Sequence, residues 1–183
     1  MLDWLLHRQI ADFERHYAYD MGYAHRMLRA SRGAFLRFSL FARLAQYRAG
    51  VPAAAYFAVR IIATLHEDCG PCTQLNLAMA TEAGVDAPIL AAIVSGDDAA
   101  LDADTLLACQ HARAVLNQDP SAHDWHERVQ ARFGERGLMT LALAIAWTRV
   151  YPTLKRALGS AHACQRLQIG GKSIVPRARV QRA

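Results

Sequence analysis

The chain has 183 residues, 53% hydrophobic and 20% charged, which excludes a disordered or fibrous protein and suffices for one domain with a buried core. Its 35 alanines against 6 prolines and 11 glycines predict an all-α fold, because alanine loses no side-chain entropy when a helix forms. Residues 172–183 contain four of the 21 basic residues and no acidic residue. The rest of the chain has 17 basic and 16 acidic residues and is therefore nearly neutral. The net charge of +5 thus does not indicate a nucleic-acid partner.

The first half of the chain predicts a series of helices. Apolar side chains recur at the spacing of one helical face between residues 6 and 17. Pro52 separates two later apolar stretches, because proline disfavours helical geometry in the residue before it. The helices expected here cover residues 6–17, 21–30, 35–47, 53–65 and 71–82.

The second half predicts further helices with marked boundaries. Asp86 is expected to cap a short helix, and Ser121 with Asp124 matches a capping box. A turn flanked by glycines is expected at residues 134–137, and no β-hairpin is predicted. The helices expected here cover residues 86–94, 102–116, 121–133 and 138–158.

These elements predict a single domain over residues 1–171, with a central part at 53–95 and closing helices at 121–160. Residues 172–183 are expected to form a frayed basic tail. Asp3 interrupts the start of the chain too early for a secretory signal, and no apolar stretch reaches the roughly 20 residues that span a bilayer. We therefore expect a cytoplasmic protein without a membrane partner.

One motif carries a strong chemical signal, the sequence Cys69-Gly70-Pro71-Cys72 at the predicted start of a helix. The N-terminus of a helix offers unpaired N–H groups and the positive end of the helix dipole, both of which favour a thiolate. In such a setting the pKa of a cysteine falls from about 8.5 to roughly 3.5–7.5. Two cysteines at this spacing can also form a disulfide with each other, so the motif predicts redox chemistry.

Three other interpretations of this motif compete. Thioredoxins also use CGPC but require a strand before it, and residues 57–65 contain enough β-branched side chains to allow one. A zinc site would recruit the two cysteines and two further ligands. Both cysteines could instead simply pack as small buried hydrophobes. The candidate additional zinc ligands are His66, Cys109, His111, His162 and Cys164.

The stretch LHEDCGPCTQLNLAMATEAGV, residues 65–85, resembles the core of the AhpD-like superfamily, the alkylhydroperoxidase D and carboxymuconolactone decarboxylase relatives. Residues 133–159 also resemble the closing helices of that family. The resemblance implies an all-helical fold that assembles into dimers, trimers or hexamers, and thiol peroxidase or disulfide chemistry with no cofactor and no metal ion. It also implies that Cys72 attacks the peroxide and Cys69 resolves the intermediate. Helix geometry alone favours Cys69 as the nucleophile, because it lies nearer the end of the helix.

The sequence departs from the peroxidase members of that family at two positions. Asn76 stands where they carry a histidine one turn after the second cysteine, and Phe57 stands where they carry a glutamate on the preceding helix. An amide cannot act as a base at neutral pH. Glu67 and His66 lie within three residues of Cys69 and are the candidate substitutes, unless Glu67 merely caps the helix.

The leading functional hypothesis is therefore a thiol oxidoreductase that works through a Cys69–Cys72 dithiol/disulfide couple. Its substrate would be a hydroperoxide or a disulfide, and an unidentified thiol reductant would restore the dithiol. One alternative is a non-enzymatic redox-sensing or partner-binding protein on the same fold. The other is an acid–base enzyme similar to carboxymuconolactone decarboxylase, against which the cysteine pair and the missing histidine count.

Overall fold

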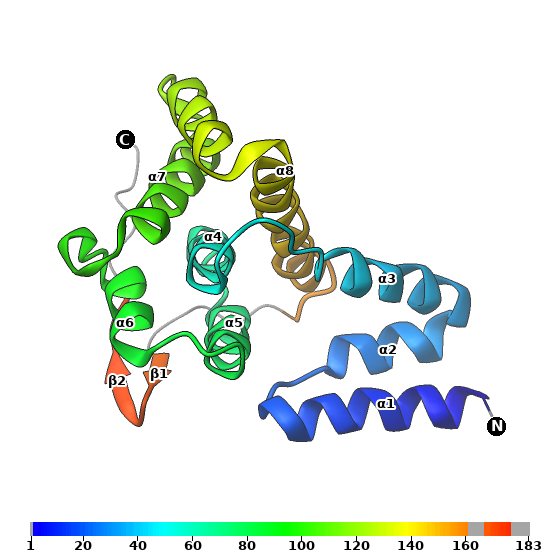
Figure 1. Cartoon of the computed structure of the whole chain (residues 1–183). Helices are drawn as coiled ribbons and strands as arrows, with labels where there is room; N and C mark the ends of the chain where they lie inside the picture. Colours follow the sequence, from blue (N-terminus) through cyan, green and yellow to red (C-terminus); the bar gives the residue numbers. More distant parts are fainter. Residues whose placement is uncertain (1, 161–166, 177–183) are drawn as a thin grey trace.

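The computed structural model describes residues 2–160 and 167–176, apart from the side chains of residues 42–44, and this part of the chain is all-α with one small hairpin. The predicted fold class is confirmed. Figure 1 shows the arrangement in one domain. The helices are α1 (Leu2–Tyr17), α2 (Gly22–Ala30), α3 (Arg32–Leu44), α4 (Ala53–His66), α5 (Gly70–Glu82), α6 (Ala87–Ser95), η1 (Asp98–Ala100), α7 (Ala103–Asn117) and α8 (Ala122–Ala157).

Helix α4 is the centre of the main core. It packs against α5, α6, α7 and α8, which surround it in Figure 1. Side chains on nearly every side of α4 are buried, including Val59 and Ile61, which are fully covered. A helix that is apolar all round is stable only when its neighbours cover it in this way. The motif at the start of α5 therefore sits directly after the best-buried helix of the fold.

Helices α1, α2 and α3 form a separate N-terminal layer with its own small core. They lie one above another beside α5 and the end of α8 in Figure 1. Their buried side chains, among them Ile10, Leu28 and Phe35, pack against Leu75 of α5 and Leu154 of α8. Apolar burial of this kind contributes about 25 cal/mol per Å². It holds the N-terminal layer against the helix that carries the cysteines.

Helix α8 is bent at Gly134, close to the predicted turn. Gly134 has φ 69° and ψ 179°, a backbone conformation that residues other than glycine rarely adopt. Three residues on, Gly137 is buried, and a Cβ added there would lie 2.2 Å from Cβ of Phe133. Both glycines are thus required, and the predicted boundary is confirmed: the helical path is interrupted at Gly134, so α8 consists of two helices that meet at a kink.

Three local predictions need correction. Residues Leu167–Ile169 (β1) and Lys172–Ile174 (β2) pair as an antiparallel hairpin, so the expected frayed tail does not begin at Lys172. Ser121 makes no side-chain cap: its backbone is already helical (φ −72°, ψ −3°), whereas a capping residue has extended geometry. Asp86 stands at the N-cap position of α6 without a side-chain hydrogen bond. Residues 177–183 of the predicted tail lie outside the described part.

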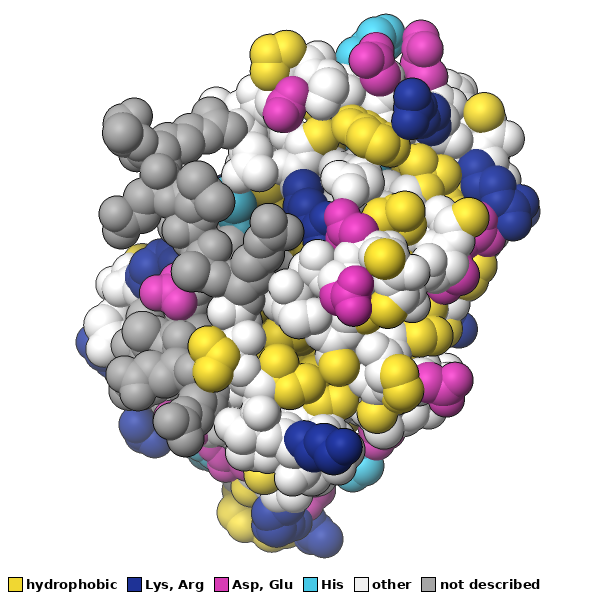
Figure 2. Space-filling model, turned by 90° about the vertical axis from the view of Figure 1, so that its left-hand side faces the viewer, with side chains coloured by type: hydrophobic (Ala, Val, Ile, Leu, Met, Phe, Trp, Pro, Cys, Tyr) yellow, Lys and Arg dark blue, Asp and Glu magenta, His cyan; other side chains and the backbone are white. Residues whose placement is uncertain are grey.

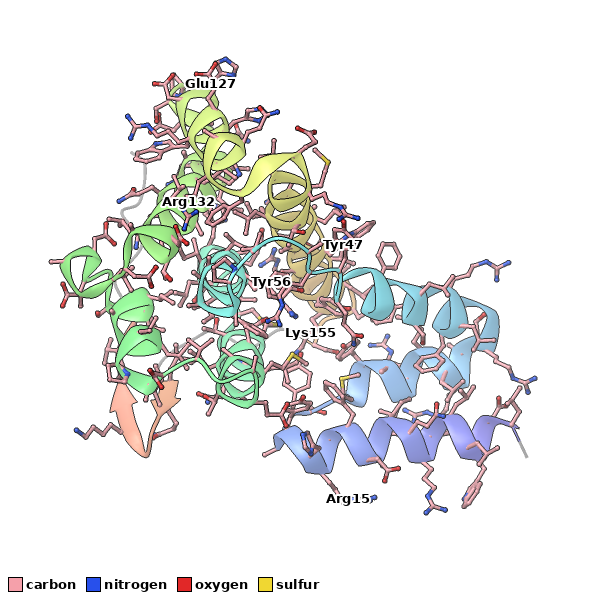
Figure 3. The ribbon with its side chains drawn as sticks, viewed as in Figure 1. Arg15, Tyr47, Tyr56, Glu127, Arg132 and Lys155 are labelled. Atoms are coloured by element: carbon pink, nitrogen blue, oxygen red, sulfur yellow. A yellow bond between two sulfur atoms is a disulfide. The ribbon has the colours of Figure 1, made fainter. Side chains whose placement is uncertain are left out.

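The surface carries both signs of charge. On the face in Figure 2, acidic and basic side chains are interspersed and several hydrophobic side chains gather in the lower half. The charged side chains of Arg15 and Glu127 point outward, whereas the side chain of Lys155 points into the interior (Figure 3). None of the described helices is both long enough and apolar enough to cross a membrane.

Candidate active site

The two cysteines of the motif stand at the start of α5 and form a disulfide. Cys69 is the N-cap residue of α5, and Cys72 lies in the first turn, with Cα atoms 5.2 Å apart. Pro71 fits this turn because its missing N–H would have no helical partner there. Cys69 is 4% exposed and Cys72 is 3% exposed, so both are closed to bulk solvent.

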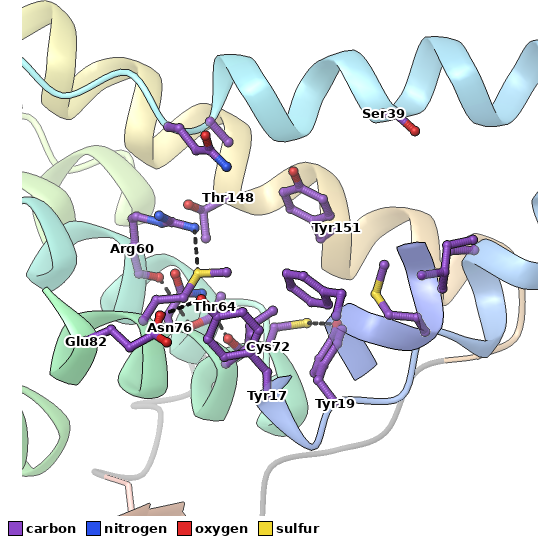
Figure 4. A pocket seen from close by; sticks show the side chains of 18 of the residues that line it. Tyr17, Tyr19, Ser39, Arg60, Thr64, Cys72, Asn76, Glu82, Thr148 and Tyr151 are labelled. Carbon is purple, nitrogen blue, oxygen red and sulfur yellow. Dashed lines mark hydrogen bonds between the residues drawn. The ribbon is translucent and has the colours of Figure 1, made fainter. Parts of the chain in front are cut away.

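A large cavity lies between the N-terminal layer and helices α4, α5 and α8 (Figure 4). Its volume is about 720 Å³, within the range of roughly 300–1,000 Å³ that is typical of ligand sites. Cys72 lines this cavity and Cys69 does not. A small molecule in the cavity would therefore meet the sulfur of Cys72 first, which agrees with the order of attack that the family resemblance implies.

Behind the sulfur of Cys72 stand a tyrosine and a lysine. The hydroxyl of Tyr19, in the connection between α1 and α2, lies 3.9 Å from Sγ of Cys72 and donates to it (Figure 4). Nζ of Lys155, on α8, donates to the same hydroxyl at 3.3 Å. The ammonium group also lies 4.9 Å from the ring centre of Tyr19. A continuous path of hydrogen bonds thus joins Cys72 to Lys155.

Burial sets the protonation of both groups. Burial, with a smaller contribution from the nearby Asp20, raises the pKa of Tyr19 well above its usual value, so its phenol keeps its proton. Burial lowers the pKa of Lys155, and Asp20 opposes this shift only in part. The Lys155 ammonium therefore loses its proton more readily than an exposed lysine does, whereas the Tyr19 phenol resists ionisation.

Glu67 is committed to two arginines. Arg149 donates to its carboxylate at 2.6 Å, and Arg156 donates both to the carboxylate and, at 2.7 Å, to the backbone carbonyl of Glu67. Burial raises the pKa of Glu67, but the hydrogen bonds from Arg156 and Arg149 outweigh it and leave the pKa below its usual value. A carboxylate held in this way is a weak base, so the geometry disfavours Glu67 as a substitute for the missing relay.

Neither predicted substitute base lines the cavity. Glu67 ends α4 as its C-cap residue instead of capping α5, and His66 lies beside it with Nδ1 4.0 Å from the Glu67 carboxylate. Glu67 connects the end of α4 to α8 through its ion pairs with Arg149 and Arg156. Their place in the structure favours a positioning role for the loop before Cys69.

Asn76 and Phe57, the two departures from the family pattern, both line the cavity. The amide of Asn76 donates to the backbone carbonyl of Cys72 at 2.9 Å, and its Oδ1 is buried with no hydrogen-bond partner among the described residues. Phe57 is buried in α4, so its place offers no proton acceptor. The family's proton relay is absent from both positions.

The structure decides between some of the other interpretations of the motif. Residues 57–65 lie inside α4, so no strand precedes the cysteines and the thioredoxin arrangement is excluded. In the described part of the chain no group of three or more His, Cys, Asp or Glu could hold a metal ion. Burial raises the pKa of the Cys109 thiol to about 12, and burial lowers that of His111. His162 and Cys164 lie outside the described residues.

Sequence reasoning missed three residues of this site: Tyr19, Lys155 and Arg60, which lies on the cavity wall. Tyr19 is 53 residues from Cys72 and Lys155 is 136 residues from Tyr19, so no local pattern connects them. One signal was available for Lys155. The chain has only two lysines against 19 arginines, and one of the two falls in the apolar last helix.

Comparisons with known proteins add no family to this picture. No family model matches the chain, and neither a curated protein nor a solved structure matches it. The resemblance to the AhpD-like superfamily thus rests on the residues quoted above, and the site is interpreted from its own geometry.

Proposed function

We propose that this protein is a thiol peroxidase that reduces organic hydroperoxides through the Cys69–Cys72 couple, with Cys72 as the attacking cysteine. The observation that carries the proposal is that Cys72, and not Cys69, lines the cavity and has Tyr19 and Lys155 behind its sulfur. The low exposure of both cysteines favours a small substrate that enters the cavity over a protein disulfide.

The reaction begins from the reduced dithiol. The amine of Lys155 takes the proton of Cys72 through the hydroxyl of Tyr19, which leaves a thiolate at the start of α5. The helix end and the Tyr19 hydroxyl both stabilise that thiolate. Depressed basicity of a buried lysine suits this task, because it accepts a proton and then releases it within one turnover.

The thiolate then attacks the terminal oxygen of the hydroperoxide. The O–O bond breaks, Cys72 becomes a sulfenic acid, and the alkoxide takes back the proton through Tyr19 and leaves as an alcohol. The thiol of Cys69 displaces hydroxide from the sulfenic acid, and water and the disulfide form. A thiol reductant must then reduce the disulfide to restore the dithiol.

Stopped-flow measurement of thiol loss tests this function. Reduced protein mixed with cumene hydroperoxide should lose two thiols as one disulfide, much faster than free cysteine reacts under the same conditions. Cys109→Ser is the matched control, because burial makes that thiol unreactive and the change should leave the rate as it is. Thiol loss no faster than that of free cysteine would remove the peroxidase proposal.

Two broader expectations belong with this proposal. A reducing compartment such as the cytoplasm would supply the thiol reductant. The family resemblance implies a homo-oligomer of two, three or six copies, and exposed apolar side chains such as Trp4 on α1 and Leu40 on α3 offer surface for such contacts. Sedimentation velocity at micromolar concentration distinguishes these assemblies from a monomer.

A further inference from the structure

The far end of the cavity holds an arginine that has no acidic partner among the described residues. Arg60, on α4, donates to the Tyr56 hydroxyl at 3.4 Å and to the sulfur of Met79 at 3.9 Å. None of the ion pairs between described residues includes Arg60. Its Nε is buried with no hydrogen-bond partner in that same part of the chain. A partly buried guanidinium group without a carboxylate is unusual, because burying an unpaired charge is costly.

The charges that line the cavity favour an anion. They are Arg60, Arg48 and Glu82, and both oxygens of Glu82 are already held, by Tyr17 at 2.6 Å and by His16 at 2.5 Å. Arg48 is exposed and lies at the rim, with its guanidinium 6.0 Å from the ring centre of Tyr56. The lining thus contains two positive charges and one negative charge, and the negative charge already has hydrogen-bond partners. This gives the cavity a positive end. Arginine is the side chain best suited to bind a carboxylate, through two parallel hydrogen bonds.

Most of the remaining cavity wall is apolar. The apolar lining includes Leu75 of α5 and four aromatic side chains, here called the aromatic wall: Phe13, Phe35, Phe38 and Tyr151. Such a surface binds a hydrocarbon or an aromatic body by removing it from water, at about 25 cal/mol per Å². The cavity therefore combines one cationic end with an apolar interior, which is the complement of an amphipathic anion.

The length of α5 gives the approximate distance between Arg60 and the sulfur of Cys72. Arg60 contacts Met79, and Met79 is seven residues after Cys72 on the same helix. Seven residues correspond to about two turns, or roughly 10 Å along the axis. A ligand whose anionic group binds Arg60 can thus place an atom about 10 Å away at the sulfur of Cys72.

We infer that the cavity binds a medium-chain organic carboxylate, with its anionic end at Arg60 and its apolar body along the aromatic wall, and that the substrate of Cys72 is a hydroperoxide of this class. The second half of this inference rests on the proposed function, and the first half does not. Asn76 and Thr148 also line the cavity with buried polar atoms that have no partner in the described residues, so a bound polar ligand has atoms to satisfy.

Calorimetry with an unreactive ligand tests the binding site without any peroxide chemistry. The probes are decanoate and its methyl ester, which share a hydrocarbon chain and differ in the charge that Arg60 would bind. They are titrated into the oxidised protein, in which Cys69 and Cys72 form the disulfide. We expect decanoate to bind at least tenfold more tightly than the ester. Equal affinities would overturn the inference in the wild-type protein, before any variant is made.

Variants then assign the charge to Arg60. Arg60→Gln should abolish the preference for decanoate over the ester, and Arg60→Lys, which keeps the charge, should retain part of it. Arg128→Gln is the matched control, because Arg128 is an exposed arginine on α8 that stacks on Trp125, 4.7 Å from the ring centre. An unchanged preference in Arg60→Gln would contradict the assignment.

The two proposals fail in different ways. If decanoate binds as expected but cumene hydroperoxide is not reduced, the carboxylate site stands and the peroxidase function falls. If cumene hydroperoxide is reduced but decanoate and its ester bind equally, the function stands and the carboxylate site falls. If both hold, a fatty-acid hydroperoxide should react at least tenfold faster than its methyl ester, and Arg60→Gln should remove that difference.

Discussion

Replacing Tyr19 by phenylalanine removes one hydroxyl from the proposed proton path and leaves the buried ring in place. The hydroxyl lies 3.9 Å from the Cys72 sulfur and 3.3 Å from Nζ of Lys155. A hydrogen bond to a charged group contributes about 1.5–3 kcal/mol, and the length of this one favours the lower end. Since one pKa unit corresponds to about 1.36 kcal/mol, Tyr19→Phe should raise the pKa of Cys72 by about one unit.

The effect on rate follows from that shift. At a pH below the pKa, the thiolate fraction falls about tenfold, but a more basic thiolate is more nucleophilic, with a Brønsted coefficient of about 0.4–0.5. The rate of attack on a hydroperoxide should therefore fall about threefold from this effect, and further through loss of the proton path to Lys155.

Ultraviolet titration of the thiolate measures the shift directly. The background carries Cys69→Ser and Cys164→Ser, and Cys109 does not interfere because burial raises its pKa to about 12. Tyr56→Phe is the matched control: Tyr56 lines the same cavity, but its hydroxyl donates to the carbonyl of Ala45 at 2.6 Å. If Tyr19→Phe and Tyr56→Phe give the same Cys72 pKa and the same rate, the role assigned to Tyr19 is wrong.

Three further predictions concern stability and reactivity. Gly134→Ala should destabilise the protein by about 1–3 kcal/mol, because Gly134 has a positive φ. Gly33→Ala, inside α3, should instead stabilise it by up to about 1 kcal/mol. If thermal denaturation shows that both substitutions change the stability in the same direction, the kink at Gly134 is contradicted. Glu67 has a lowered pKa when folded, so its stabilisation is present above its ordinary pKa of 4.5 and lost as the pH falls below it. Glu67→Gln should therefore flatten the acid side of the stability curve measured by urea denaturation, and an unchanged acid side would refute the ion pairs. Cys109 should resist iodoacetamide at neutral pH in the folded protein, and mass spectrometry that finds it alkylated there would contradict its burial.

The helices were predictable because their signals are local. The helix expected at residues 53–65 is observed at Ala53–His66, and the one expected at 71–82 is observed at Gly70–Glu82. Apolar side chains at helical spacing and proline boundaries act within a few residues, so the sequence displays them. The hairpin was missed because each strand has only three residues, too few for a visible alternation around Gly170 and Gly171.

The site was predictable only as far as its chemistry is local. The cysteine pair shows itself by spacing, and Asn76 and Phe57 were recognised as departures from a family pattern. Tyr19 reaches the sulfur, and Lys155 reaches Tyr19, only because the N-terminal layer and α8 pack against α5. The same packing gives Glu67 two arginine partners, which turns a candidate base into an ion-paired carboxylate. Contacts of this range depend on the tertiary fold and leave no pattern in the sequence.

Trapping of the first oxidised intermediate tests the central claim most directly. Reduced Cys69→Ser and reduced Cys72→Ser are each mixed with cumene hydroperoxide and a sulfenic-acid-specific reagent, and the labelled cysteine is identified by mass spectrometry. Attack by Cys72 predicts a stable sulfenic acid on Cys72 in Cys69→Ser, because the resolving thiol is absent, and no label above background in Cys72→Ser. A sulfenic acid on Cys69 in Cys72→Ser, with none on Cys72 in the other variant, would contradict the account.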